Sequence, residues 1–329
     1  MARSPTISRR TPQRPPPPRH ERRAPLPWHC PKSAEDDPHA PARVQRLLES
    51  PSYREADEDP ALLAQPQMRG VRLHLDYWKA ENLLQENAVA HTIVVFGSTR
   101  TLEPAAAARC LAAAREALRE APDDAEAARN VRVAERMVEK SRYYDIARAF
   151  GRLVAEANHG RAADKLVVMT GGGPGIMEAA NRGAFDVGAK TAGCNVKLPH
   201  PQFPNPYISP ELCFRFHYFA IRKLHLVQRA RALVVFPGGY GTFDELFEAL
   251  ALVQTRTIAP LPIVLVGERY WRRVVDFDLL VEEGMIDPED VELFWYAESA
   301  EEIWKGIRAW HADPRKPPQP EGNISCFAP

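Results

Sequence analysis

The chain has 329 residues, and its 43 Lys and Arg residues are balanced by 43 Asp and Glu residues, so the formal net charge is zero. This length accommodates one large domain or two modest ones, and the balanced charge provides no overall field that would attract nucleic acid. Because no apolar run is long enough to span a bilayer, the sequence also predicts no membrane association.

The N-terminal segment, residues 1–40, is rich in Pro and Arg and includes the proline run 15–18. Such a composition buries too little apolar surface to offset its ordering entropy, so we predict a disordered tail. Its arginines superficially resemble an organelle transit peptide, but the prolines disfavour the amphipathic helix that such a peptide needs. A ligand for a proline-recognition domain is the other functional interpretation.

Helices are predicted on both sides of the first strand. Residues 41–90 form an N-terminal helical extension, which we expect to pack on the core or across a dimer; its apolar side chains include Val71, Leu73, Leu75, Tyr77, Trp78, Leu83 and Leu84. Residues 103–158 are rich in Ala and Arg, and their mixed charges at 116–140 are typical of connecting helices with a solvated face. We assign no chemistry to this second region.

A strand–helix alternation fills the remaining core, residues 91–312, and a loose tail follows at 313–329. Near-continuous apolar runs suit a sheet covered on both faces, and connections long enough for helices favour parallel pairing. The sequence therefore predicts an α/β three-layer sandwich with an open, mostly parallel sheet of about seven strands. The strands are expected near 92–97, 166–170, 191–196, 232–236 and 262–266, with weaker ones near 212–216 and 291–296.

Three of these strands run into glycine-containing turns: Gly97-Ser98, the segment 171–175 and the segment 237–242. Open parallel sheets bind ligands at the carboxyl ends of their strands. The free N–H groups and the macrodipole at a helix start favour an anion such as phosphate there. We expect Glu245 in the first turn of the helix after the third turn, where it either serves a bound ligand or caps the helix.

Other glycine-loop chemistries are disfavoured. Ile176 stands where a dinucleotide-binding turn has its third glycine, and Asn195 replaces the acidic residue that would hold a ribose. The turn at 237–242 lacks the Lys-Ser or Lys-Thr pair of a P-loop. Pyridoxal-dependent decarboxylation needs a Schiff-base lysine and a partner for the ring nitrogen, and beyond Lys223 nothing in the sequence supports it.

A family resemblance is carried by two stretches, GGGPGIMEAANRGA (171–184) and PGGYGTFDE (237–245). They resemble the LONELY GUY-type phosphoribohydrolases, formerly labelled lysine decarboxylases, whose motif PGGxGTxxE follows an Arg-Lys pair on the preceding helix. Here that pair is Arg222-Lys223, and the resemblance covers roughly 92–266. It implies a Rossmann-like fold and cleavage of the N-glycosidic bond of a nucleoside 5′-monophosphate, AMP-like or a cytokinin riboside 5′-monophosphate, to free base and ribose 5-phosphate. The extra length is similar to that of longer bacterial members, some of which act as general nucleotide nucleosidases.

The resemblance also implies roles for individual residues. Glycosidic cleavage passes through an electron-poor sugar, which a carboxylate can stabilise, so Glu245 is the predicted catalytic residue and Arg222 its partner. Lys223 is a second choice, because adjacent helix residues diverge by about 100°. The remaining predicted substrate and phosphate contacts are Gly238, Gly239, Gly241 and Thr242 on one wall, Thr170, Gly172 and Gly173 on the other with Ser98 nearby, and Glu178, which contacts the ribose or caps its helix.

Aromatic residues at 217–219 are expected either to stack on the base or to form a buried cluster. Two departures from the family pattern, Asp244 and the segment 254–257, bear on base preference more than on reaction type. Arg182 and Asn181 match the motif but are equally explained by packing.

No metal requirement and no cofactor are predicted, because the histidines are dispersed and the five cysteines are scattered without ligand spacing. Free cysteines indicate a reducing cytoplasm, and the family implies a homodimer or higher homo-oligomer. The alternative function is a non-catalytic nucleotide or cofactor carrier on the same fold, similar to molybdenum-cofactor carrier proteins. The presence of both Arg222 and Glu245 favours the enzyme.

Overall fold

A computed structural model describes residues 24–157, 166–200 and 202–313. The proline run 15–18 and all but one residue of the predicted C-terminal tail 313–329 therefore lie outside the described residues. The chain divides into two compact units, Met1–Met68 and Arg69–Pro329. Helix α3 (Arg69–Glu86), which the sequence analysis placed in the N-terminal extension, belongs to the larger unit.

The smaller unit consists of short helical elements. Proline stands in the first turn of most of them, where its missing N–H has no intrahelical partner to lose. Among its described residues only Ala40 is buried, so this unit has almost no core of its own. Its elements are η1 (Pro27–His29), α1 (Ala40–Leu48), η2 (Pro51–Tyr53), η3 (Ala56–Glu58), α2 (Pro60–Ala64) and η4 (Pro66–Met68).

The larger unit is built on a seven-stranded sheet with the order β4-β3-β2-β1-β5-β6-β7, in which every neighbouring pair is parallel. Both weaker strands of the sequence analysis are present, and the predicted fold class is confirmed. The chain adds strands to one side of β1 as far as β4 and then returns to its other side, so the switch point lies between β1 and β5. The strands are β1 (His91–Phe96), β2 (Leu166–Thr170), β3 (Thr191–Val196), β4 (Cys213–Phe216), β5 (Ala230–Val235), β6 (Ile263–Val266) and β7 (Phe294–Ala297).

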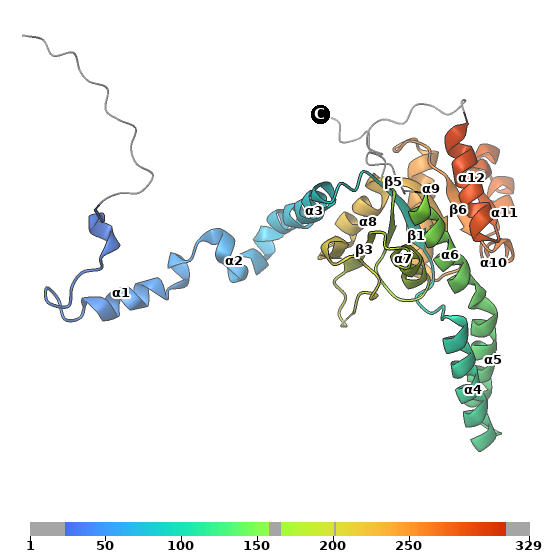
Figure 1. Ribbon diagram of the computed structural model, residues 1–329, viewed down its shortest axis with the longest axis horizontal. Helices are drawn as coiled ribbons and strands as arrows, with labels where there is room; N and C mark the ends of the chain where they lie inside the picture. Colours follow the sequence, from blue (N-terminus) through green and yellow to red (C-terminus); the bar gives the residue numbers. More distant parts are fainter. Residues whose placement is uncertain (1–23, 158–165, 201, 314–329) are drawn as a thin grey trace, which may run out of the picture. The chain divides into compact units, whose positions relative to one another are not determined.

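Helices cover both faces of this sheet (Figure 1). Successive residues of β1 point to opposite sides, so Val94 and Phe96 enter one core cluster while Ile93 and Val95 enter the other. The first cluster includes residues of α3, α8 (Phe219–Gln228), α9 (Tyr240–Gln254), α10 (Glu268–Val274) and α11 (Phe277–Glu282). The second includes residues of α6 (Arg142–Glu156), α7 (Ile176–Phe185) and α12 (Ala300–Ala312).

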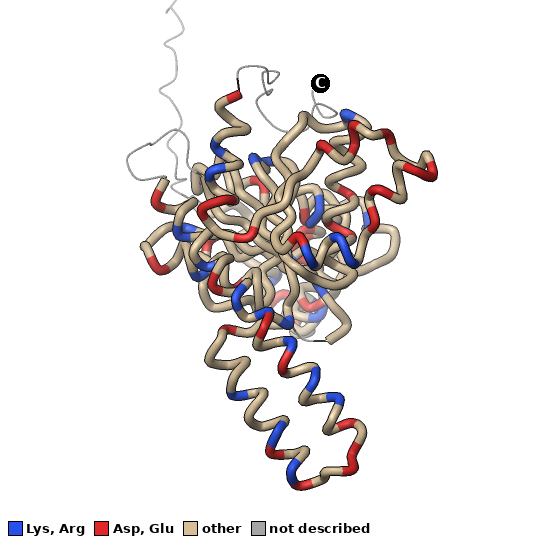
Figure 2. Tube along the Cα trace, turned by 90° about the vertical axis from the view of Figure 1, so that its right-hand side faces the viewer, with Lys and Arg blue, Asp and Glu red and all other residues tan. Residues whose placement is uncertain are grey.

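Helices α4 (Pro104–Glu120) and α5 (Ala125–Lys140) pair as a hairpin that extends away from the sheet, with basic and acidic residues distributed along it (Figure 2). Ala107 and Ala127 are the buried residues of the two helices, as expected for a largely solvated element. Two 3-10 helices, η5 (Pro210–Leu212) and η6 (Pro288–Leu293), complete the unit. No helix among the described residues has the length and apolar character needed to cross a membrane.

Candidate active site

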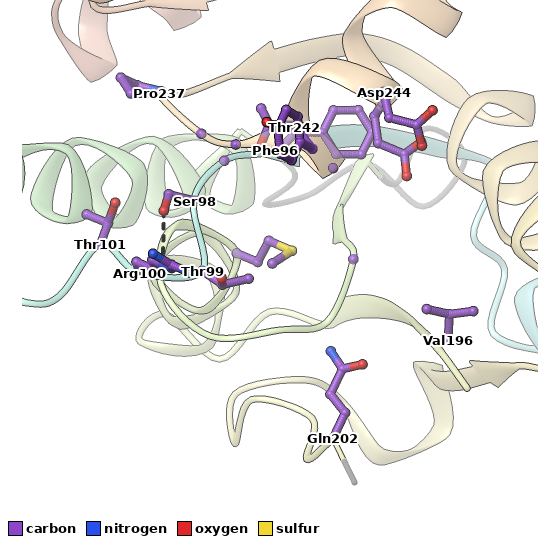
Figure 3. A pocket seen from close by; sticks show the side chains of 18 of the residues that line it. Phe96, Ser98, Thr99, Arg100, Thr101, Val196, Gln202, Pro237, Thr242 and Asp244 are labelled. Carbon is purple, nitrogen blue, oxygen red and sulfur yellow. Dashed lines mark hydrogen bonds between the residues drawn. The ribbon is translucent and has the colours of Figure 1, made fainter. Parts of the chain in front are cut away.

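A cavity of about 660 Å³ opens at the carboxyl ends of the central strands, at the switch point between β1 and β5. This is the place where open parallel sheets bind ligands. Val196 and Gln202 lie across it from Thr242 and Asp244 (Figure 3). From the predicted site, the cavity wall includes Ser98, Arg222, Gly238, Gly239, Gly241, Thr242 and Glu245.

The turn after β5 presents unpaired backbone amides to this cavity. Helix α9 begins at Tyr240 with Gly239 as its N-cap, and no side chain caps it. The N–H groups of Tyr240 and Gly241, the first two of the helix, therefore have no intrahelical acceptor, whereas the Thr242 N–H donates to the Gly239 carbonyl oxygen at 2.9 Å. The expected position of Glu245 was wrong, since the first turn holds no acidic residue and Glu245 lies in the second turn. Tyr240 and Gly241 are part of the helix, so it begins earlier than we expected. The positive end of its dipole therefore has no acidic residue in the adjoining first turn.

Close packing fixes the shape of this turn. A Cβ atom on Gly238 would collide with the side chain of Thr242, so only glycine fits there. The carbonyl oxygen of Gly238 accepts a hydrogen bond from the Tyr270 hydroxyl. Above Gly239 and Gly241, by contrast, no atom lies within 4 Å of where a Cβ would stand. The turn is thus fixed by contacts at Gly238, while the backbone at Gly239 and Gly241 is accessible to a ligand.

Glu245 and Arg222 form a buried ion pair in the cavity wall. Arg222 Nη1 donates to Glu245 Oε1 at 2.9 Å, and the two side chains are only 12% and 5% exposed. Arg222 Nε donates to the carbonyl oxygen of Cys194 at 2.9 Å, which fixes the guanidinium against β3. Burial raises the pKa of Glu245, while the positive charge of Arg222 opposes that rise. The result is an oriented carboxylate in a largely dry wall.

Lys223 points elsewhere. Its Nζ pairs with Asp244 at 2.9 Å and with Glu248 at 3.1 Å, both on α9, and it does not line the cavity. Asp244 does line the cavity, but its charge is compensated by this pair. Adjacent residues on α8 therefore serve different partners, as the 3.6-residue helical period requires.

Ser98 connects the three glycine turns. Its N–H donates to the Pro237 carbonyl oxygen at 3.0 Å, and its own carbonyl oxygen accepts from the Ile176 N–H at 3.1 Å. The Ser98 hydroxyl accepts from the Arg100 N–H at 3.0 Å (Figure 3). These bonds hold the ends of β1, β2 and β5 together around the cavity.

The turn after β2 contributes Gly171 to the cavity wall, whereas Thr170, Gly172 and Gly173 are not among the lining residues. The hydroxyl of Thr170 donates to Asn181 at 2.7 Å and accepts from the Gly172 N–H at 3.0 Å. Gly172 has φ of +75°, a conformation that favours glycine. Here these residues shape the turn from within the core.

Glu178 is also outside the cavity wall. It accepts a hydrogen bond from the Tyr144 hydroxyl at 2.7 Å, and no side chain caps its helix. Arg182 donates to Glu103 at 3.0 Å. Asn181 is fully buried and bonds to Thr170 and Asn205. The polar residues of α7 thus anchor the helix to its neighbours.

Phe219, one of the aromatic residues at 217–219 that were expected to stack on the base or to form a buried cluster, lies in the cavity wall. Its ring is half exposed, and the Arg222 guanidinium lies 5.6 Å from the ring centroid. The sequence analysis missed Lys140 and Tyr270, which also line the cavity; they come from segments with no recognisable motif, so no local signal could have identified them. His217 and Tyr218, the other two aromatic residues at 217–219, do not line the cavity. Their backbone N–H groups donate to the Asp76 carboxylate.

A protein-family profile described as "Possible lysine decarboxylase" matches residues 177–307. Two cytokinin riboside 5′-monophosphate phosphoribohydrolases of Arabidopsis thaliana are similar to the chain. LOG1 is 31% identical over 43% of this chain and 66% of its own length. LOG3 is 28% identical over 52% of this chain and 77% of its own length. The chain belongs to the LONELY GUY-type family. An uncharacterised protein of Archaeoglobus fulgidus is 32% identical over 38% of this chain and 76% of its own length.

The matches span about two thirds of the LONELY GUY relative LOG1. The glutamate of the family motif, Glu245, and the arginine of its Arg-Lys pair, Arg222, are the two residues that meet in the cavity wall. Among the described residues, no group of three or more His, Cys, Asp or Glu side chains is arranged to hold a metal ion.

Proposed function

We propose that this protein hydrolyses the N-glycosidic bond of a nucleoside 5′-monophosphate, AMP-like or a cytokinin riboside 5′-monophosphate, and releases a free base and ribose 5-phosphate. One observation carries the proposal: a buried, oriented carboxylate, Glu245, shares a cavity with an uncapped helix N-terminus. An anion-binding end and a carboxylate in one cavity suit a substrate with a phosphate at one end and a reacting sugar at the other.

The 5′-phosphate would bind the amides of Gly239, Tyr240 and Gly241, which begin α9, with the Thr242 hydroxyl as a further donor. Such a contact is remote from the bond that breaks. Its binding energy can position the ribose, so a nucleoside without the phosphate should lose rate as well as affinity.

Glu245 would act on the sugar. As the bond between C1′ and the base nitrogen breaks, its electrons leave with the base and C1′ becomes positively charged. A carboxylate beside C1′ stabilises that charge and orients the water that adds there; one proton of the water is lost and the departing base gains one. Arg222 keeps Glu245 ionised and in place, and the exposed ring of Phe219 offers a face for the base.

Self-association is part of the proposal. Large apolar side chains on the cavity rim are exposed, with Tyr240 94%, Phe219 49% and Leu198 39% accessible. A second copy covering this rim would exclude water from the reaction. Light scattering coupled to size-exclusion chromatography measures the assembly directly, and a strictly monomeric protein would contradict this part.

The activity is tested with a panel of 5′-monophosphates (AMP, GMP, CMP, UMP, IMP and isopentenyladenosine monophosphate) and the matching nucleosides, with free base and ribose 5-phosphate quantified by chromatography. Glu248→Gln is the matched control for Glu245→Gln, because Glu248 lies on the same helix but outside the cavity wall. Release from monophosphates that is lost only in the Glu245 variant supports the proposal. Tight nucleotide binding without release from any member of the panel would favour the carrier function instead.

A further inference from the structure

A second cavity, of about 770 Å³, borders the candidate active site. It lies between the end of α5, the start of α6 and α10. We name it the basic cleft, and its lining residues are Arg136, Glu139, Lys140, Arg142, Tyr143, Arg269, Tyr270, Arg273 and Val274.

Positive charge in the basic cleft is largely uncompensated. Glu139 is the only carboxylate of its lining, against five cationic side chains. Arg142 pairs with Glu298 at 3.3 Å. Within the described residues, none of the other four cations has a carboxylate partner within 4.0 Å. The whole chain is formally neutral, so this concentration of charge is local and not a consequence of composition.

Like charges that converge on one hollow repel each other, and an anion bound among them removes that cost. Arginine presents planar N–H donors that match phosphate oxygens in pairs, and four of the five cations in this cleft are arginines. Its two tyrosine rings lie under cations: Arg142 is 4.8 Å from the Tyr143 centroid, and Lys140 is 5.9 Å from the Tyr270 centroid. These rings support the cations without neutralising them.

The basic cleft is continuous with the candidate active site through shared residues. Lys140 and Tyr270 line both cavities, and the Tyr270 hydroxyl bonds to the Gly238 carbonyl oxygen in the turn before α9. A chain of phosphates is the ligand that uses several cations spread over such a volume, since a single phosphate would meet only a few of them. We propose that the basic cleft binds a polyphosphate chain. That chain belongs either to a separate ligand or to a nucleotide whose first phosphate occupies the turn before α9.

Calorimetric titration of the full-length protein with sodium tripolyphosphate at fixed ionic strength tests this directly. The variant Arg136→Gln/Arg273→Gln removes two unpaired cations from the basic cleft and touches no residue of the candidate active site. The matched control Arg109→Gln/Arg132→Gln removes two exposed arginines of the α4–α5 hairpin outside the cleft. We expect at least about tenfold weaker binding in the cleft variant and nearly wild-type binding in the control. No binding by the wild type, or equal losses in both variants, would overturn the proposal.

Two further arms distinguish the sources of the polyphosphate. If it is a separate ligand, saturating ribose 5-phosphate leaves tripolyphosphate binding intact. If it is part of a nucleotide, ADP binds the Glu245→Gln variant more tightly than AMP does, and adding Arg136→Gln/Arg273→Gln abolishes that advantage. All these readouts are binding measurements, so their failure is separate from any failure to detect hydrolysis, and hydrolysis without polyphosphate binding would leave the proposed function standing.

Discussion

Arg222 on α8 donates to Glu245 on α9 at 2.9 Å and, through its Nε, to the Cys194 carbonyl oxygen of β3. One side chain therefore connects two helices and a strand around the cavity. Because Glu245 is buried, its carboxylate has this guanidinium as its main electrostatic compensation. The pair gives the cavity a charged group of fixed orientation, which a catalytic carboxylate requires.

We expect Glu245→Gln to lower kcat for a nucleoside 5′-monophosphate by about 10²–10⁴-fold with little change in KM, because the amide keeps the shape but cannot stabilise a cationic sugar. Steady-state kinetics on the best substrate measures this, with the thermal unfolding midpoint recorded alongside. A kcat within a factor of about three of wild type in a folded variant would remove Glu245 from the mechanism.

We expect kcat/KM to fall in acid with a midpoint pH above 4.5, the ordinary pKa of a glutamate carboxyl group. Burial raises the pKa of Glu245, and the reaction uses its ionised form. Arg222→Gln removes the positive charge that opposes this rise, so the midpoint should move to still higher pH. Profiles of the two proteins between pH 4 and 8 make the comparison. A midpoint that moves to lower pH in the variant would contradict the assignment of Glu245 as the titrating group.

Two helical glycines should respond oppositely to alanine. A Cβ on Gly183 of α7 would meet the backbone of Arg148 on α6, so Gly183→Ala must push two packed helices apart and should cost about 1–3 kcal/mol or more. Near Gly70 of α3 no atom lies within 4 Å of the added Cβ, and Gly70→Ala should be neutral or stabilise by up to about 1 kcal/mol. Urea unfolding of both variants measures the difference. Equal effects would show that α6 and α7 are not in such close contact.

His225 should make the protein less stable in acid. It is 1% exposed and stacks on Tyr77, and burial lowers its pKa from 6.5 to about 4. The unfolded chain therefore binds a proton more readily than the folded one. The stability from neutral His225 is fully present above about pH 6.5 and is lost as pH falls towards 4, by at most about 3 kcal/mol.

We expect His225→Gln to flatten the dependence of the unfolding free energy on pH across this window, while His200→Gln, at an exposed position, leaves the slope unchanged. Urea titrations at several pH values between 4 and 7 give the slopes. Identical slopes in wild type and His225→Gln would show that another group governs the acid sensitivity.

Much of the fold was predictable because its signals are local. The apolar runs that become β2, β5 and β6 are buried on both sides, and such strands read as continuous hydrophobic segments. Glycine turns at their ends are equally local, since a tight turn leading into a helix constrains only a few neighbouring residues. The family motif added Glu245 and Arg222 as candidates for one site.

The start of α9 was harder to place, because a helix boundary depends on backbone conformation that several sequences accommodate. Thr170 and Glu178 belong to motifs next to the cavity, yet packing against Asn181 and Tyr144 turns their side chains to other partners. Whether a polar side chain faces a ligand or a neighbour depends on competing hydrogen bonds that the sequence does not display.

By itself, the sequence determined the strands and the glycine turns, since these depend on hydrophobic pattern and short motifs, and the family motif in it indicated Glu245 and Arg222 as candidates. Only the tertiary structure decided that Arg222 reaches Glu245 and that Lys223 does not share that contact. It also brought Lys140 from α5 and Tyr270 from α10 to the same wall, where the basic cleft meets the candidate active site. Residues so far apart in the chain meet through the packing of helices on a common sheet, and packing is a property of the whole fold.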